Sequence, residues 1–134
     1  MANINWRLDS PLENTQAIDA LETQYGFTLP DSLRQLIIAH NAAFPKPDRC
    51  AVPGLGERDV KMLLSYNPDD PETVYDVFEF FFKRSRGRLI PFASDSGSGY
   101  YCLSGAQVVY IDENELASHV VAQDFASFWD GLFE

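Results

Sequence analysis

The chain has 134 residues, a length typical of one domain that buries most of its apolar side chains. Hydrophobic residues make up 46% of it and include ten phenylalanines, so we expect one folded domain over 1–134 and exclude a globally disordered chain. Twenty acidic residues against ten basic ones give a formal net charge of −10. This charge disfavours nucleic acid as a ligand and favours a basic protein partner, although solubility alone also explains it.

Signals for export or membrane insertion are not evident in the sequence. The first residues contain no apolar stretch of signal-peptide length, and no run approaches the roughly 20 residues of a membrane span. We therefore expect a cytoplasmic protein that does not bind a membrane. Cys50 and Cys102 lie far apart without CxxC spacing, which favours two free thiols over a disulfide.

Two helices are expected in the first third of the chain. Ser10 and Pro11 are typical of a helix start and Gly26 of a helix end, which predicts a helix over 11–25. A second start signal and apolar residues at helical spacing predict another helix over about 31–41. Because about four residues join them, the two should form a helical hairpin.

The middle of the chain mixes loop, strand and helix. Prolines and glycines between 44 and 57 predict a loop with one short strand at 50–52. The segment 59–66 is expected to be a strand. Asp70-Pro71 repeats the pairing of a cap with a proline, and a broad apolar stripe follows to about Lys83, which predicts a third helix.

The segment from Leu89 to Leu103 organises the second half of the chain. It has two apolar runs joined by a small, polar, glycine-rich connection, which predicts a β-hairpin with a long tip. Gly97 and Gly99 are expected to supply positive φ angles in that tip. The apolar run from Val108 to Ile111 should add a third strand, so the segment forms a meander that helices cover.

The end of the chain predicts a helix with a wide aromatic face. The segment 112–115 fits an acidic turn or a short helix, and 117–122 is ambiguous. Asp124 is a typical helix cap, and five apolar residues follow it at i, i+3, i+4, i+7 and i+8 spacing. They are Phe125, Phe128, Trp129, Leu132 and Phe133. Such a face must cover the core, so the elements together predict an α+β fold.

Patterns that would indicate catalysis or metal binding are weak. The loop 94–99 lacks the glycine two residues before Ser98 that a nucleophile elbow requires, and no phosphate-loop lysine follows it. His40 and His119 have no paired spacing and no neighbouring cysteine, which favours structural roles over zinc binding. We therefore predict no catalytic residue, no metal and no cofactor.

Charged residues gather in short clusters. A solvated surface is the simpler explanation of the acidic ones, but together they could form a patch for a basic partner. The candidate contact residues are Asp69, Asp70, Glu72, Asp95, Tyr100, Asp112, Glu113 and Glu115. A basic run at 83–88 could bind an anion, but we favour cations that complement a helix C-terminus. These residues are Lys83, Arg84, Arg86 and Arg88.

Five short motifs follow one another along the chain. They are Leu29-Pro30 before a helix that ends at His40-Asn41, Leu89 to Asp95 before a glycine-containing loop, Tyr101-x-Leu103, Val108 to Tyr110, and Asp124-Phe125-x-x-Phe128. In order and spacing they resemble the SMI1/KNR4 (SUKH) family from about Ile18 to Leu132. The resemblance implies a curled, mostly antiparallel sheet with an N-terminal helical hairpin and a C-terminal helix packed on it. Asn41-Ala42-Ala43 departs from the family's Asn-Gly, which removes the easy left-handed turn there.

The resemblance implies a binding protein. Many bacterial members are immunity proteins that neutralise a cognate toxin, often a nuclease, and fungal relatives are regulatory interaction proteins. The family brings no universal catalytic residue. We therefore expect a non-enzymatic, immunity-type protein that occludes a basic toxin. A regulatory or scaffold protein that binds a cellular partner is the alternative, and a small hydrolase that uses Asp95 and Ser98 is a third.

Overall fold

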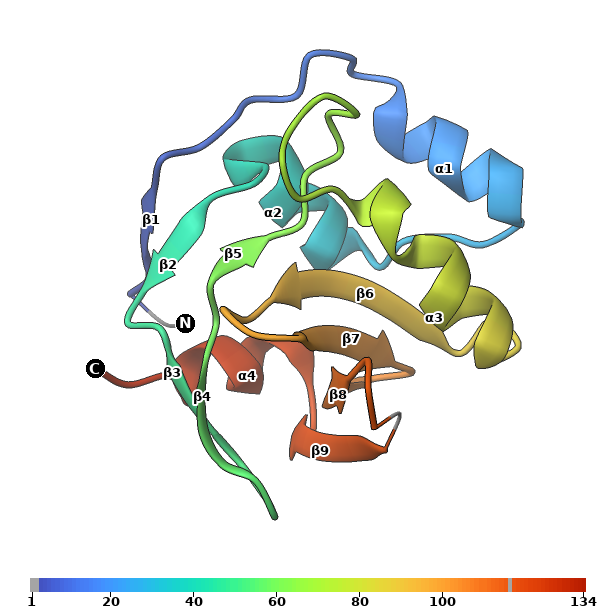
Figure 1. Cartoon of the computed structure of the whole chain (residues 1–134). Coiled ribbons are helices and arrows are strands. Elements are labelled where there is room, and N and C mark those ends of the chain that lie inside the picture. Colours follow the sequence, from blue (N-terminus) through green and yellow to red (C-terminus); the bar gives the residue numbers. More distant parts are fainter. Residues whose placement is uncertain (1–2, 116) are drawn as a thin grey trace.

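The structure is a computed structural model that describes residues 3–115 and 117–134. Helices and strands alternate irregularly within it, so the predicted α+β class is confirmed (Figure 1). Its strands are β1 (Asn5–Arg7), β2 (Phe44–Lys46), β3 (Arg49–Val52), β4 (Gly56–Asp59), β5 (Met62–Leu63), β6 (Leu89–Ser94), β7 (Gly99–Ser104), β8 (Gln107–Asp112) and β9 (Ser118–Ala122). Its helices are α1 (Ala17–Tyr25), α2 (Asp31–His40), α3 (Phe78–Arg84), α4 (Phe125–Asp130) and the short 3₁₀ helix η1 (Val74–Asp76).

A five-stranded antiparallel sheet in the order β5-β6-β7-β8-β9 forms the centre of the fold. The predicted hairpin and third strand are confirmed as β6, β7 and β8, and the ambiguous segment 117–122 provides β9. The strand expected over 59–66 is reduced to Met62–Leu63 in this sheet. It stops there because Ser65 exchanges backbone hydrogen bonds with Glu72 and Val74 instead.

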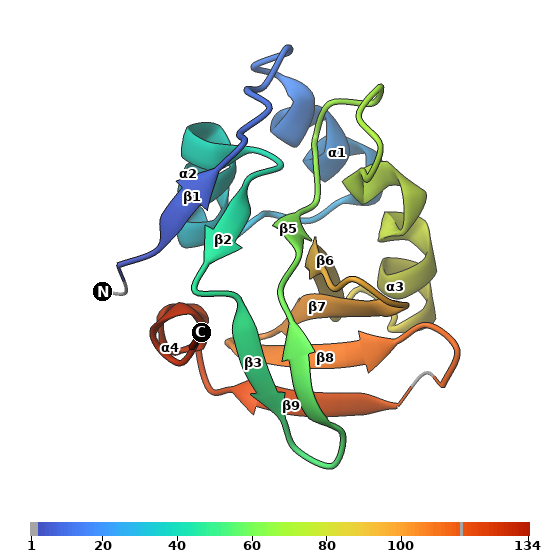
Figure 2. The ribbon, with the colours of Figure 1, turned by 60° about the vertical axis from the view of Figure 1, so that its left-hand side comes forward.

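The sheet is open, which corrects the expectation of a curled one. In the part of the chain that the structure describes, its edge strands β5 and β9 do not pair with each other. β5 is too short to close a barrel, because two residues offer few free backbone groups. The hairpin of β3 and β4 packs beside β9 instead, and β1 with β2 forms a separate two-stranded sheet (Figure 2).

The first helix starts later than the sequence predicts. α1 begins at Ala17 rather than at 11, because the side chain of Asn67 binds the chain there and occupies the Pro11 carbonyl oxygen that a first helical turn would need. Its Nδ2 donates to the Pro11 carbonyl oxygen at 2.9 Å, and its Oδ1 accepts from the Glu13 backbone N–H at 2.9 Å. The helix end is confirmed, since Gly26 takes a left-handed φ of 69°.

The other helices agree with the predictions in order and differ in length. α2 ends at His40, and Ala42 then takes a φ of 63°, so the chain keeps a left-handed residue where the family has glycine. The helix expected from Asp70 to about Lys83 is divided, because Thr73 caps η1 through its side chain and α3 starts only at Phe78. α4 ends at Asp130, three residues before Phe133, which pairs with Arg49 as an extended residue.

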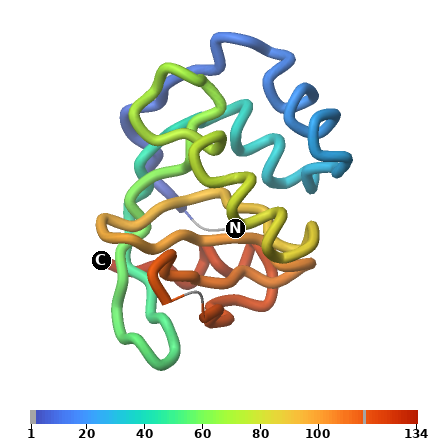
Figure 3. Tube along the Cα trace, turned by 45° about the vertical axis from the view of Figure 1, so that its right-hand side comes forward, coloured from blue at the N-terminus to red at the C-terminus, as the bar shows by residue number. Residues whose placement is uncertain are grey.

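Helices cover both faces of the central sheet. Side chains alternate along β7, so the neighbours Tyr100 and Tyr101 point to opposite faces. The ring of Tyr100 lies 5.4 Å from that of Phe81 in α3, and the ring of Tyr101 lies 5.2 Å from that of Phe128 in α4. α3 and α4 therefore pack on opposite faces, while α1 and α2 lie together at one end of the molecule (Figure 3).

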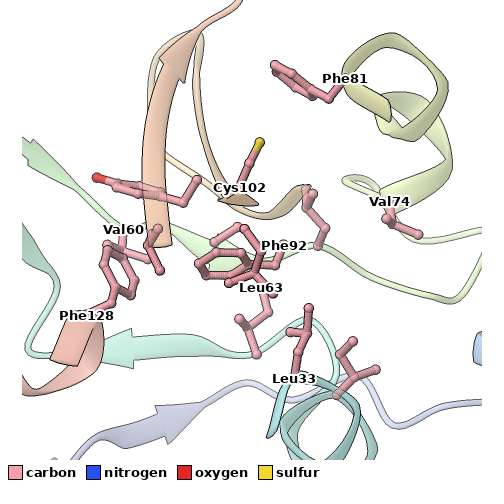
Figure 4. Close-up of a cluster of buried hydrophobic side chains, with 14 of the residues drawn as sticks. Leu33, Val60, Leu63, Val74, Phe81, Phe92, Cys102 and Phe128 are labelled. Atoms are coloured by element: carbon pink, nitrogen blue, oxygen red, sulfur yellow. The ribbon is translucent and has the colours of Figure 1, made fainter. Parts of the chain in front are cut away.

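The core continues from the sheet to both sets of helices. Phe92 of β6 lies near its centre with Leu63, between Leu33 of α2 and Phe128 of α4 (Figure 4). Phe128 and Trp129 are 2% and 7% exposed, so the prediction that the last helix covers the core is confirmed for them. No helix that the structure describes is long and apolar enough to cross a membrane.

The tip of the β6–β7 hairpin is held by a buried carboxylate. Asp95 is 5% exposed, and its Oδ1 accepts hydrogen bonds from the backbone N–H groups of Gly97 and Gly99, both at 2.8 Å. Its Oδ2 accepts from the Tyr110 hydroxyl at 2.6 Å. Neither glycine has the positive φ that we expected. Gly99 is required for another reason, because a Cβ there would overlap the Tyr110 ring.

We predict that Phe128→Ala destabilises the protein by about 3–5 kcal/mol, because it leaves a cavity under α4. Phe133→Ala is the matched control. That ring is 38% exposed, so its loss should cost about 1 kcal/mol or less. Urea unfolding followed by circular dichroism measures both free energies. Equal losses for the two variants would contradict the placement of α4 on the core.

We predict that Gly99→Ala destabilises the protein by about 1–3 kcal/mol, because the new methyl group must displace the Tyr110 ring from Asp95. Gly97→Ala should change the free energy of unfolding by less than about 1 kcal/mol. A Cβ at that position meets the Asp95 Oδ1 at 3.6 Å, which is an ordinary contact. Thermal unfolding of both variants tests the difference, and a Gly99→Ala protein as stable as wild type would exclude the close approach.

Candidate functional site

A half-buried tyrosine lies among acidic side chains from three segments of the chain. Burial raises the pKa of Tyr100, and the nearby negative charges of Glu113, Glu72, Asp76 and Asp95 raise it further. Of these carboxylates, Asp76 and Glu113 are exposed and Glu72 is half-buried. We call Glu72, Asp76, Tyr100 and Glu113 the Tyr100 surface. It lies on the face of the sheet that α3 covers, towards the start of that helix.

Neighbouring elements hold the carboxylates of Glu72 and Asp76 and the backbone of Glu113 in place. Glu72 pairs with Lys61 and accepts a hydrogen bond from the Ser94 hydroxyl at 3.2 Å. Asp76 belongs to the capping box of η1 with Thr73. Glu113 follows β8, and its backbone N–H donates to the Ser98 carbonyl oxygen at 3.0 Å. Because only the backbone of Glu113 is held, its side chain stays available on the exterior.

The remaining acidic candidates of the β8–β9 turn lie beside Glu113. Asp112 is half-buried and accepts from the Asn114 backbone N–H at 2.9 Å and from the Ser98 hydroxyl at 2.8 Å. Both hydrogen bonds lower the pKa of Asp112, and the one from the Asn114 backbone has the larger effect. Glu115 is exposed in the same turn. This turn therefore presents the exposed carboxylates of Glu113 and Glu115, with the half-buried Asp112 beside them.

Two other acidic candidates belong to a different polar network. The carboxylate of Asp70 accepts hydrogen bonds from the Ser65 hydroxyl and from the Asn67 side chain. The Ser65 hydroxyl stabilises the charged form, which lowers the pKa of Asp70. Asp69 next to it is exposed. The network ties the loop after β5 to the chain before α1, so Asp70 has a structural role that explains it without a partner.

Asp95 does not belong to an exposed surface. Its carboxylate is buried, and its three hydrogen bonds come from two backbone N–H groups of the hairpin tip and from the Tyr110 hydroxyl of β8, as described above. The candidate set of the sequence therefore divides in the structure. Asp95 supports the surface from beneath, whereas Tyr100, Glu72 and Glu113 form it.

Among the described residues, neither histidine forms a hydrogen bond with Ser98 or Asp95, the two residues of the hydrolase alternative. Ser98 donates its hydroxyl to Asp112, and both oxygens of Asp95 are occupied. His40 contacts Asp9 and His119 contacts the Pro53 carbonyl oxygen. Among the residues that the structure describes, no three His, Cys, Asp or Glu side chains are grouped to hold a metal ion.

The two cysteines are free and buried, as predicted. Burial raises the pKa of the Cys50 thiol to about 11, and burial also raises that of Cys102. A thiol with a raised pKa is a poor nucleophile at neutral pH. Both side chains therefore act as small core residues rather than as reactive groups.

An apolar groove that the sequence did not indicate runs between β1, α2 and α4. It has a volume of about 720 Å³. Its walls include Ile4, Trp6, Leu36, Phe125 and Trp129. These residues come from the two ends of the chain and from α2, so no local sequence pattern could have brought them together. Phe125 faces this groove as well as the core, which is why it is only half-buried.

The lowered pKa of Asp70 predicts an acid-dependent loss of stability. A carboxyl group whose folded-state pKa lies below its unfolded value stabilises the fold above the unfolded pKa, and this contribution is lost as the pH falls through the folded pKa. The unfolding free energy of wild type should therefore fall more steeply below about pH 4 than that of Asp70→Asn. Urea titrations between pH 6 and about pH 2.5 measure both slopes. Parallel slopes would contradict the stabilising role of the Ser65–Asp70 contact.

Comparison with known proteins identifies the family. No curated protein matches the chain in sequence. The model of the SMI1/KNR4 family (SUKH-1), however, matches residues 14–131, which is nearly the whole chain. The match includes α1, the entire central sheet and α4. The chain therefore belongs to the SMI1/KNR4 family (SUKH-1).

Proposed function

We propose that this protein is a non-enzymatic, immunity-type protein that binds a basic toxin through the Tyr100 surface. Membership of the SUKH-1 family supports an immunity-type role. The observation that carries the choice of surface is that Glu72 and Asp76 of one segment and Glu113 of another lie near the half-buried Tyr100, on the face of the sheet that α3 covers. Such a convergence is more specific than the net charge, because it concerns one place on the molecule.

The chemistry of the Tyr100 surface suits a protein partner. Tyrosine is enriched among the residues that dominate binding energy, and such residues lie at the centre of an interface with a polar rim around them. Tyr100 is half-buried against Phe81, so its ring is already fixed before a partner arrives. The surrounding carboxylates would attract lysines and arginines and would mainly raise the association rate.

The side-chain contacts also support a binding role over catalysis. Ser98 is the only nucleophile among our candidate residues. Its hydroxyl donates to the Asp112 carboxylate, which also accepts a hydrogen bond from a backbone N–H. An activated serine needs a base that can take its proton, and the half-buried Asp112 has a lowered pKa. The proposal includes a cytoplasmic location, because two free buried thiols suit a reducing compartment.

The test is capture of the partner from the native cell with wild type and with the variant Asp76→Lys/Glu113→Lys. Wild type should enrich a basic protein that is toxic when expressed alone, and wild type should block its activity at equimolar ratio. The variant should bind that toxin at least about tenfold more weakly. Its association rate should also depend less on salt than that of wild type.

The matched control is Asp130→Lys/Glu134→Lys, which changes the net charge equally at two exposed residues of the α4 end. This control should bind the toxin with nearly the affinity of wild type, because it loses only a little long-range electrostatic attraction. If both variants bind the toxin equally weakly, the loss of affinity is an effect of net charge, and the assignment of the Tyr100 surface is wrong. A captured partner that is harmless to cells would contradict the immunity role and favour the regulatory one.

A further inference from the structure

A second concave site lies at the other end of α3. α3 packs against β6, and β8 and β9 lie further along the same sheet (Figure 1). Between the end of the helix and those strands lies a hollow of about 300 Å³. Its lining includes Arg84, Arg88, Leu89, Val109, Ile111 and Ser118. We call it the Arg84–Arg88 hollow.

The floor of the hollow is apolar and regular. Val109 and Ile111 alternate along β8, so both side chains point to the α3 face. Ser118 of β9 is paired with Ile111, and cross-strand partners share a face of the sheet. An exposed hydroxyl therefore lies beside two apolar side chains. Val109 and Ile111 are 4% and 3% exposed, so a flat apolar group in the hollow would touch only the ends of these two side chains.

The rim of the hollow carries two arginines. The Arg84 guanidinium stacks over the Phe80 ring, 5.1 Å from its centroid, and the Arg88 Nε donates to the Ser85 carbonyl oxygen at 3.2 Å. Within the described residues neither forms an ion pair, whereas Arg34 pairs with Asp19 and Glu22. In a chain with twice as many acidic as basic residues, two unpaired arginines at one cavity are an uncommon concentration of positive charge.

The connection that carries Arg88 is fixed before any ligand binds. The Ser85 hydroxyl accepts from the backbone N–H groups of Arg88 and Leu89 at 3.1 and 2.9 Å, and it donates to the Phe82 carbonyl oxygen at 3.1 Å. Arg86 and Gly87 then take φ angles of 57° and 84°. A tight turn of this kind directs the chain back to β6, with Arg88 beside the end of α3.

The helix dipole explains only part of this arrangement. Lys83 and Arg84 lie in the last turn of α3, where a cation is stabilised by the negative end of the helix. That effect fades beyond the terminal turn. Arg88 lies outside the helix, in the connection to β6. Its Nε donates to the carbonyl oxygen of Ser85, the C-cap residue of α3, and this contact holds Arg88 at the rim of the hollow.

We propose that the Arg84–Arg88 hollow binds a small organic anion. Its phosphate or carboxylate head would be held between the two guanidinium groups, which have the fork geometry that such oxygens prefer. Its flat apolar body would lie over Val109 and Ile111. The volume suits a single ring with one head group, at the small end of ligand pockets. This inference goes beyond the proposed function and does not rest on it.

The test is an NMR titration of the ¹⁵N-labelled full chain with phenyl phosphate. The probe should cause saturable shifts that are centred on the backbone amides of Ser104, Ile111 and Ser118. Inorganic phosphate supplies the head alone and benzyl alcohol the ring alone. Each should bind at least about tenfold more weakly than phenyl phosphate, because neither uses both parts of the hollow.

Variants separate the hollow from general attraction to positive charge. Arg84→Gln/Arg88→Gln should weaken phenyl phosphate binding by at least about tenfold. Ser118→Trp keeps both arginines and should also abolish binding, because the indole fills the space. The control Arg7→Gln/Arg58→Gln makes the same charge change away from the hollow and should bind like wild type. Amide dispersion in the NMR spectrum checks the fold of each variant.

Three results would overturn the proposal. The first is the absence of saturable shifts with phenyl phosphate in wild type. The second is binding by Arg84→Gln/Arg88→Gln that equals that of wild type. The third is binding of inorganic phosphate as tight as that of phenyl phosphate, since the apolar floor would then have no part in recognition.

Discussion

The buried carboxylate of Asp95 is the contact on which the rest of the candidate site depends. Its three hydrogen bonds join the hairpin tip to Tyr110 of the next strand. Bonds to a charged acceptor are stronger than neutral ones, and a buried carboxylate that lost them would be costly. The hairpin tip that is fixed in this way holds Ser98. The Ser98 hydroxyl donates to the Asp112 carboxylate, and the Ser98 carbonyl oxygen accepts from the Glu113 backbone N–H. The exposed acidic turn is thus positioned by an acid in the interior.

Elements with a strong local pattern could be predicted from the sequence. α2, the β6–β7–β8 meander and α4 each combine clear periodicity with matching turn or cap residues, and all three are present in the structure. The errors arise where a distant partner outweighs the local signal. Ser10-Pro11 would start a helix by itself, but Asn67 takes up the backbone there. Local patterns contain no information about a side chain more than fifty residues away.

The candidate site shows the same division. Glu72 and Glu113 could be proposed from the acidic clusters of the sequence. Asp76 could not, because its capping role gives no sign that it lies near Tyr100. Asp95 looked like an exposed loop residue, and only the fold places the Tyr110 hydroxyl above it. Arg88 was attributed to a helix end that lies before it in the chain. The residue types are evident in the sequence, but the pairing of strands determines which of these residues lie together.

The two proposed sites lie on one face of the sheet and are separated by little more than α3. That helix has seven residues and is about 10 Å long. A protein interface of ordinary size covers about 800 Å² on each partner, a disc of about 16 Å radius. A toxin centred on Tyr100 would therefore reach the Arg84–Arg88 hollow. An anion bound there would meet the basic toxin at its edge, and by linkage each would change the affinity of the other to the same extent.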